Sequence, residues 1–139
     1  MHLAKLITGP LLLVLLTPLT YAEEFKIAGK KIEFFQYDEM RVTISKKCED
    51  LNQKKLCKDL EFLNDISLSK AGITGTGTRN PGSTICTKLL GGRVVFGRDS
   101  ENNENSFCHL KDGTYIDSGT LTYYAMKNEG LIKTPTRRK

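Results

Sequence analysis

The residues best suited to acid–base chemistry lie close together in the last third of the sequence. His109 is followed by two aspartates, Asp112 and Asp117. A histidine beside a carboxylate can move protons in a small hydrolase, because the carboxylate orients the imidazole and stabilises its charged form. Each aspartate also has a structural interpretation: Asp112 precedes a glycine in a turn, and Asp117 can cap a following helix. The sequence therefore offers three catalytic candidates but no recognised catalytic motif.

Four cysteines bring a second kind of chemistry: Cys48, Cys57, Cys86 and Cys108. An even number of cysteines in an oxidising compartment favours two disulfides. We expect the pairs Cys86–Cys108 and Cys48–Cys57, because each pair then lies within one half of the chain. A continuous helix from Cys48 to Cys57 would separate their Cα atoms by about 13 Å, beyond the roughly 7 Å that a disulfide spans. Either that helix breaks near Asn52, or one of these two cysteines pairs elsewhere.

Metal binding and thiol catalysis fit the spacing of these cysteines poorly. Consecutive cysteines are 9, 29 and 22 residues apart, whereas a zinc site typically uses pairs of Cys or His two to four residues apart. Cys108 and His109 are adjacent, and adjacent residues of a strand point to opposite faces of the sheet. The sequence therefore predicts no metal site, no cofactor and no Cys–His catalytic pair.

The first 22 residues have the pattern of a cleavable secretory signal peptide. Lys5 supplies the positive charge, residues 11–16 form a short apolar run, and Thr20 and Ala22 are the small residues before the cleavage site. The run is shorter than the about 20 apolar residues that cross a bilayer as a helix. We expect cleavage after Ala22, no transmembrane segment in the mature chain, and a periplasmic or secreted protein.

The N-terminal region, residues 23–70, is predicted to form a β-hairpin followed by a helix. Apolar and polar residues alternate along 24–36 around a turn at 28–30, and a third short strand is expected at 40–44. A helix capped by Ser45 would carry its apolar side chains inward: Leu51, Leu56, Leu60, Leu63 and Ile66. The opposite face of that helix is rich in Lys and Asp, which is typical of a solvated surface.

A Gly- and Thr-rich linker is predicted at 71–79, followed by a helix that starts at Asn80 and Pro81. Gly91 and Gly92 are typical of the end of that helix. A hairpin with strands near 93–96 and 106–110 and a final helix after Asp117 would complete a helix–hairpin–helix module at 80–128.

These elements together predict an α+β fold, stapled by disulfides. The N-terminal β-hairpin and helix would form one part, and the helix–hairpin–helix module would form the other. Residues 129–139 are expected to form a basic tail.

The net charge of the chain indicates which classes of partner it could attract. The chain has 21 Lys and Arg residues against 16 Asp and Glu residues, a net charge of +5. An exported protein with this balance is attracted weakly to anionic polymers of the cell envelope. Nucleic acid is not an expected partner, because the compartment is wrong and no nucleic-acid-binding motif is present.

A combined motif runs through the C-terminal module: Asn80-Pro81-Gly82-Ser83, Cys86, Gly91-Gly92, Cys108, Asp112-Gly113-Thr114 and Ile116-Asp117. Over about residues 79–128, this pattern resembles a small bacterial family of unknown function that is often labelled haemolysin. The usual form of the family has alanine where Gly82 stands and serine where Thr114 stands. The resemblance implies an exported protein of the bacterial cell envelope, and it implies no particular reaction.

Three functions remain open from the sequence. The preferred function is a non-enzymatic binding or structural module of the envelope with an unknown ligand, for which Tyr115, Tyr123 and Tyr124 are candidate contact residues. An inhibitor of a secreted hydrolase would instead use residues 97–105 as a protruding loop. A small hydrolase would use His109 with a nearby carboxylate, and a pocket uniting the two groups would support it.

Overall fold

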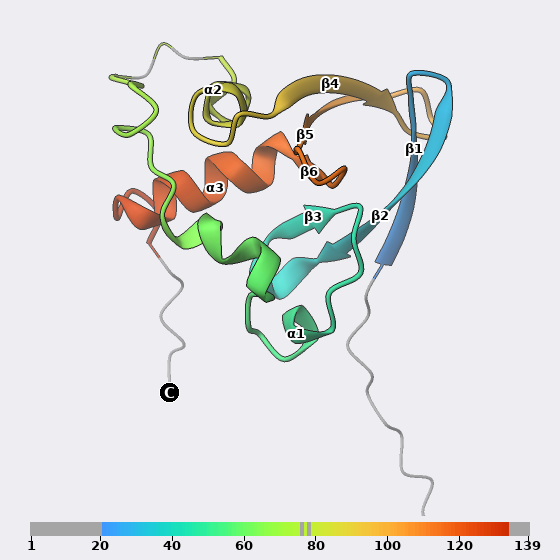
Figure 1. Ribbon diagram of the computed structural model, residues 1–139, viewed down its shortest axis with the longest axis horizontal. Helices are drawn as coiled ribbons and strands as arrows, with labels where there is room; N and C mark the ends of the chain where they lie inside the picture. The colour runs from blue at the N-terminus through green and yellow to red at the C-terminus, as the bar shows by residue number, and fades with distance from the viewer. Residues whose placement is uncertain (1–20, 76, 78, 134–139) are drawn as a thin grey trace, which may run out of the picture.

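The computed structural model describes residues 21–75, 77 and 79–133 (Figure 1). The predicted signal peptide therefore lies outside the described residues, except for Tyr21 and Ala22. Residues 76 and 78 of the predicted linker and residues 134–139 of the predicted basic tail also lie outside them. Six strands and several short helices make up the described part.

The described chain begins with the predicted β-hairpin. Strand β1 (Tyr21–Ile27) pairs with β2 (Lys30–Tyr37) along its whole length. Ala28 and Gly29 connect the two strands with φ angles of 48° and 80°. Two successive residues in this left-handed region form the tight turn whose twist matches that of the strands it connects.

The hairpin continues into a closed barrel with the strand order β1-β2-β3-β6-β5-β4. The further strands are β3 (Val42–Ile44), β4 (Arg93–Arg98), β5 (Glu104–His109) and β6 (Tyr115–Asp117). Every pair of neighbouring strands is antiparallel.

The predicted α+β fold, with a hairpin-and-helix part and a helix–hairpin–helix part, is wrong. Strand β3 pairs with β6 at Ile44 and Ile116, and β1 pairs with β4 at Ile27 and Gly97. Each half alone would leave strand edges with unpaired N–H and C=O groups, which bind other strands readily. The edges of the two halves pair with one another, so one antiparallel barrel replaces two separate parts.

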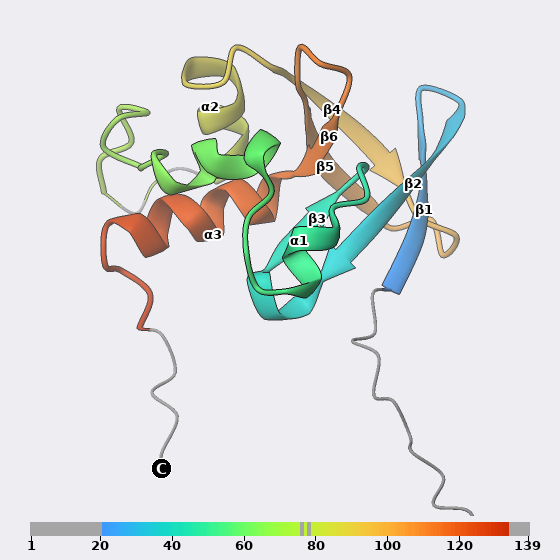
Figure 2. The ribbon, with the colours of Figure 1, turned by 60° about the horizontal axis from the view of Figure 1, so that its bottom comes forward.

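Two helices lie along one side of the barrel, α2 (Pro81–Lys88) and α3 (Ser118–Asn128), as Figures 1 and 2 show. Asn80 caps α2 and Asp117 caps α3, each through a side-chain oxygen that accepts a backbone N–H. These caps satisfy donors that have no partner inside the helix. In the part of the chain that the structure describes, no helix has the length and apolar character needed to cross a membrane.

The helix expected after Ser45 breaks just after Asn52, as the favoured Cys48–Cys57 pairing requires. The chain forms one α-helical turn, α1 (Glu49–Asn52), and resumes as the 3-10 helix η2 (Lys58–Asn64). Between them Lys54 has a φ angle of 61°, which is incompatible with a right-handed helix. The break brings the first two cysteines to a Cα–Cα distance of 6.2 Å, and they form a disulfide.

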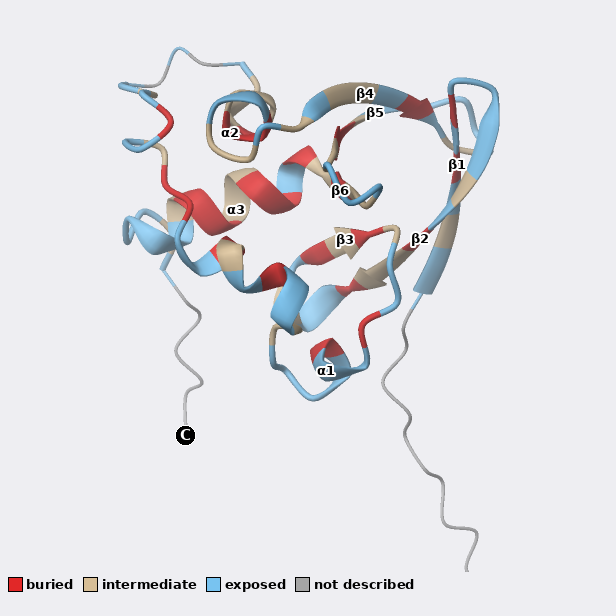
Figure 3. Ribbon diagram, in the orientation of Figure 1, coloured by how far each residue is buried: buried red, intermediate tan, exposed pale blue. Residues whose placement is uncertain are grey.

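Two hydrophobic clusters hold these elements together, and Figure 3 shows the buried faces turned toward them. The barrel interior contains Phe25, Ile27, Phe34 and Phe107, with the Phe34 and Phe107 ring centroids 4.5 Å apart. A larger cluster packs the sheet against the helices and includes Ile44, Ile85, Cys86, Cys108, Ile116 and Leu121. Within it, the Cys86–Cys108 disulfide joins α2 to β5 with a Cα–Cα distance of 5.5 Å.

Gly97 lies where the barrel closes, opposite Ile27 of β1. A Cβ atom there would lie 2.8 Å from Ile27 Cγ1 and 3.0 Å from Phe107 Cε2. We predict that Gly97→Ala lowers the free energy of unfolding by about 1–3 kcal/mol, the usual cost of overpacking, as measured by urea denaturation. Gly77→Ala is the matched control, because a Cβ atom at Gly77 would meet nothing within 4 Å. Equal stability of the two variants would contradict closure of the barrel at this position.

Candidate functional site

The structure places His109 away from the other catalytic candidates. His109 is half-buried on β5 and stacks on Tyr115 of β6, with ring centroids 4.3 Å apart and planes within 4° of parallel. Its Nδ1 atom lies 3.4 Å from Arg93 Nη2. Asp112 instead accepts the N–H of Thr114 at 2.9 Å within the β5–β6 turn. Among the described residues, no carboxylate lies within ion-pair distance of the imidazole.

Asp117 lies at the end of β6, where its carboxylate accepts the N–H of Thr120 at 3.2 Å. Burial raises the pKa of this carboxyl above its ordinary value, although backbone N–H groups favour the charged form. Asp117 lines a pocket with Arg41 and Tyr123, and His109 is not part of that pocket. The catalytic candidates therefore do not form a His–carboxylate pair.

Residues 21–75, 77 and 79–133 contain no cluster of side chains that could bind a metal ion. No group of three or more His, Cys, Asp or Glu side chains in this part of the chain could hold a metal ion. All four cysteines are bonded in the two disulfides.

The candidate tyrosines lie in two places. Tyr115 belongs to the stack described above, whereas Tyr123 and Tyr124 are neighbours on α3 with edge-to-face rings 5.4 Å apart. Tyr124 is only 1% exposed, and its hydroxyl donates a hydrogen bond to the carbonyl of Met40 at 2.9 Å. This bond ties α3 to the 3-10 helix η1 (Asp38–Met40). Tyr124 therefore holds a turn of the N-terminal half against the C-terminal helix.

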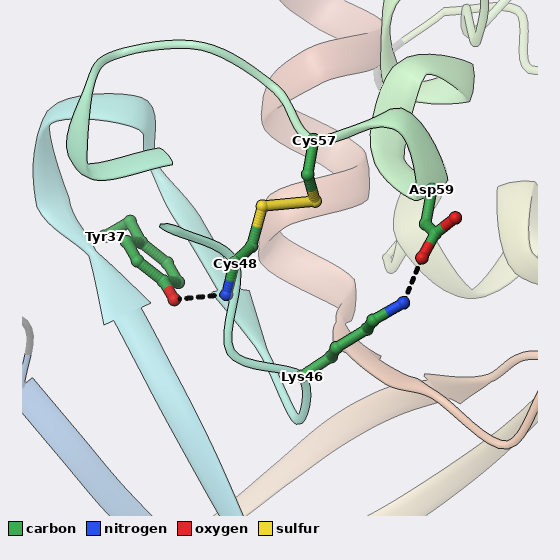
Figure 4. Close-up of a disulfide and its surroundings, with 5 residues drawn as sticks. All are labelled: Tyr37, Lys46, Cys48, Cys57 and Asp59. Carbon is green, nitrogen blue, oxygen red and sulfur yellow. Dashed lines mark hydrogen bonds and ion pairs between the residues drawn. A yellow bond between two sulfur atoms is a disulfide. The ribbon is translucent and has the colours of Figure 1, made fainter. Parts of the chain in front are cut away.

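A stapled loop between Cys48 and Cys57 lies beside this contact (Figure 4). The disulfide joins the two ends of the loop. The Cys48 N–H also donates to the hydroxyl of the buried Tyr37 at 2.8 Å, and Lys46 forms an ion pair with Asp59 just beyond the disulfide. The loop is thus held at its base by a covalent bond and a hydrogen bond, whereas the exposed ion pair adds little.

The loop, η1 and α3 enclose a pocket of about 320 Å³, which we call the lysine pocket. Its lining combines three lysines with an apolar floor and consists of Met40, Lys54, Lys55, Leu56, Glu61, Asn64, Tyr124 and Lys127. Two of the lysines come from the stapled loop and one comes from the last turn of α3. Three cations against one carboxylate give the pocket a positive potential, which favours an anionic ligand.

The three lysines of the pocket differ in whether they have an ion-pair partner within the protein. Lys54 Nζ lies 3.1 Å from Glu39 Oε2, but both side chains are more than half exposed, and such surface pairs contribute little energy. Neither Lys55 nor Lys127 has an ion-pair partner among the described residues. The Lys127 ammonium lies 5.2 Å from the centre of the Tyr124 ring, within reach of a cation–π contact. Two ammonium groups are therefore available to pair with a ligand.

The sequence alone does not single out these lysines. A Lys-rich stretch after Cys48 is typical of a solvated helix face, and Lys127 lies far from it along the chain. Two local signals were available: Lys54 and Lys55 are adjacent between two cysteines, and Lys127 follows Tyr124 by about one helical turn. Neither signal shows that the two segments meet.

The predicted inhibitory loop at 97–105 contains the turn between β4 and β5. The Asp99 carboxylate accepts the backbone N–H groups of Glu101 and Asn103 at 2.9 Å and 2.8 Å, and it also accepts the Asn103 side-chain amide. These hydrogen bonds lower the pKa of Asp99 below its ordinary value. The turn is therefore organised around a single aspartate.

Tyr124, which lines the lysine pocket, has a raised pKa. Burial, and to a smaller extent the neighbouring Tyr123, raises the pKa of Tyr124 to about 12 from the ordinary value of 10.0. Folding therefore favours neutral Tyr124, and this contribution is fully present below about pH 10 and is lost as the pH rises toward about 12. The loss amounts to about 2–3 kcal/mol.

We predict that ultraviolet titration of the five tyrosines shows one tyrosine that ionises last, and that Tyr124→Phe removes this step. The Phe variant also loses the hydrogen bond to Met40, so it is expected to be less stable near neutral pH by about 1 kcal/mol. A titration curve whose last step survives in Tyr124→Phe would contradict the burial of this hydroxyl.

Comparison with known proteins finds one match. Residues 77–123 match the family model described as Domain of unknown function (DUF333). The match spans α2 and part of α3, so it includes Tyr123 but neither η1 nor the stapled loop. No curated protein and no solved structure matches the chain. The match confirms the resemblance to a family of unknown function over residues 77–123 of the chain, and it carries no haemolysin label.

Proposed function

We propose that this protein is an exported binding module of the bacterial cell envelope that holds an anionic polymer at the lysine pocket. The observation that carries the proposal is the convergence of Lys54, Lys55 and Lys127 around one pocket. Lysine ammonium groups pair with phosphate or carboxylate groups as point charges and tolerate variation in ligand geometry. A polymer with regularly repeated anionic groups meets this requirement.

The setting of the lysines strengthens the case for a binding site over a solvated surface. The stapled loop fixes the backbone that carries Lys54 and Lys55, which reduces the conformational entropy that binding would otherwise remove. Met40, Leu56 and Tyr124 place apolar surface next to the charges, and ion pairs beside such surface are screened less by water. Cleavage after Ala22 would remove Lys5 and leave 20 basic against 16 acidic residues, and this net charge of +4 adds a long-range attraction for anions.

Export is supported by the predicted signal peptide at residues 1–22 and by the two disulfides. Disulfides persist in oxidising compartments such as the periplasm and are rare in the cytosol. Cleavage after Ala22 would remove two residues of β1 and leave Glu23 to Ile27 paired with β2. The strand that closes the barrel would thus remain in the mature chain.

The lysine pocket can be tested with long-chain polyphosphate as a simple polyanion. We predict that the double variant Lys55→Gln and Lys127→Gln lowers the affinity for polyphosphate about fivefold per lysine, equivalent to about 1 kcal/mol each. Isothermal titration calorimetry at low ionic strength measures the effect, and binding is expected to weaken as salt is added.

A matched double variant separates the pocket from general charge attraction. Lys30→Gln with Lys88→Gln removes the same charge from exposed positions outside the lysine pocket, and it is expected to lower the affinity less than twofold. Equal losses in both double variants would show that net charge alone attracts the polymer, and would overturn the proposed site.

Export is tested by expressing the full chain in a bacterium and sequencing the N-terminus of the protein that accumulates. We predict that the protein is recovered from the periplasm or medium with Glu23 as its first residue, because Ala22 is the last small residue of the cleavage motif. Recovery of an intact chain that begins with Met1 from the cytoplasm would contradict this part of the proposal.

A further inference from the structure

A second pocket, like the lysine pocket, is lined by residues from η1 or just after it and from α3. It has a volume of about 230 Å³, and its polar and aromatic lining consists of Tyr37, Asp38, Arg41, Thr43, Asp117, Thr120 and Tyr123. The two pockets share their supporting segments, because Met40 of the lysine pocket precedes Arg41, and Tyr123 precedes Tyr124. Only a ligand long enough to extend from one pocket to the other would occupy both. We call this second hollow the Arg41 pocket.

Arg41 lines this pocket and has an uncommon backbone conformation. Its φ angle is 54°, in the left-handed region, and its N–H closes η1 by donating to the carbonyl of Asp38 at 3.2 Å. The guanidinium lies 5.7 Å from the centre of the Tyr123 ring. No carboxylate of the described residues lies within ion-pair distance of Arg41, so its donors are available to a ligand.

The Arg41 pocket differs from the lysine pocket in its charge. Asp38 and Asp117 oppose Arg41 in the lining, so a bare phosphate or carboxylate gains from one cation and is repelled by two acidic side chains. The hydroxyl groups of a sugar ring suit this mixture better than a bare anion, because hydroxyls donate to the carboxylates and accept from the guanidinium. The Tyr123 ring adds a flat apolar surface on which the C–H face of a sugar ring can pack.

The size of the pocket agrees with a single ring. Pockets for drug-sized molecules span about 300–1,000 Å³, and the Arg41 pocket of about 230 Å³ lies just below that range. It therefore suits one unit of a longer chain.

We infer that the Arg41 pocket is a sugar subsite, and that the anionic polymer held at the neighbouring lysine pocket is a polysaccharide. This inference rests on the proposed function, because it names the class of polymer that the lysine pocket takes. The Arg41 pocket holds the hydroxyl-bearing edge of one sugar ring, and the lysines pair with the anionic groups of the chain. A polyanion without sugar rings uses the lysines alone.

Two polymers and one pair of variants test the inference. Polygalacturonate carries a carboxylate on every sugar ring, whereas long-chain polyphosphate carries charge without sugar. We expect Tyr123→Leu to lower the affinity for polygalacturonate roughly fivefold or more, the loss typical of removing one stacking ring, and to change polyphosphate binding less than twofold. Tyr123→Phe keeps the ring and is expected to bind both polymers like the unaltered protein. Thermal unfolding of each variant confirms that the chain is folded.

The outcomes separate the sugar subsite from the lysine pocket. Loss of polygalacturonate affinity in Tyr123→Leu, with retention in Tyr123→Phe, supports the subsite. If Tyr123→Leu binds polygalacturonate normally, or weakens both polymers equally, the subsite is overturned while lysine-dependent binding of polyphosphate still stands. If the variant with Lys55→Gln and Lys127→Gln binds both polymers normally, the proposed function itself fails, and the inference fails with it.

Discussion

Backbone pairing between β3 and β6 joins the two halves of the chain into one sheet. The pairing is short, and side-chain hydroxyls extend it. Ser45 donates its N–H to the carbonyl of Tyr115 and accepts the Tyr115 N–H through its own hydroxyl, at 2.9 Å and 2.8 Å. Thr43 donates its N–H to the hydroxyl of Thr120 at 3.0 Å. These contacts hold the segment that follows η1 against β6 and the start of α3. Both pockets are lined by residues from η1 or just after it and from α3.

The elements with local signals could be predicted from the sequence, and the closure of the barrel could not. Ala28 and Gly29 lie within the predicted turn, and Asn80 and Asp117 are side chains that cap helices wherever a helix follows. Strands β3 and β6 have three residues each, too few for a hydrophobic pattern to show which distant strand they pair with. Lys54 takes a left-handed conformation without being glycine, so the break in the helix has no local compositional signal, and only the expected Cys48–Cys57 disulfide indicated it.

The candidate site is a product of the whole chain. The DUF333 segment at residues 77–123 supplies Asp117 and Tyr123, whereas the stapled loop and η1 come from the N-terminal half, and Lys127 lies beyond the match. The three tyrosine candidates therefore identified the site only in part. Tyr123 lines a pocket with Arg41, and Tyr124 lines a pocket with the lysines, and no sequence motif identifies these cations. A function shared by the DUF333 family would have to use the matched segment, while the lysine pocket belongs to this chain as a whole.

The measurement that tests this account most directly is nuclear magnetic resonance of the mature protein during titration with polygalacturonate. If one face built from both halves binds the polymer, amide shifts will change together around residues 38–41, 53–56 and 123–128. Changes confined to one of these segments would contradict a shared site. Changes confined to the basic residues after Leu131 would show that the C-terminal tail, and not the pocket pair, attracts the polymer.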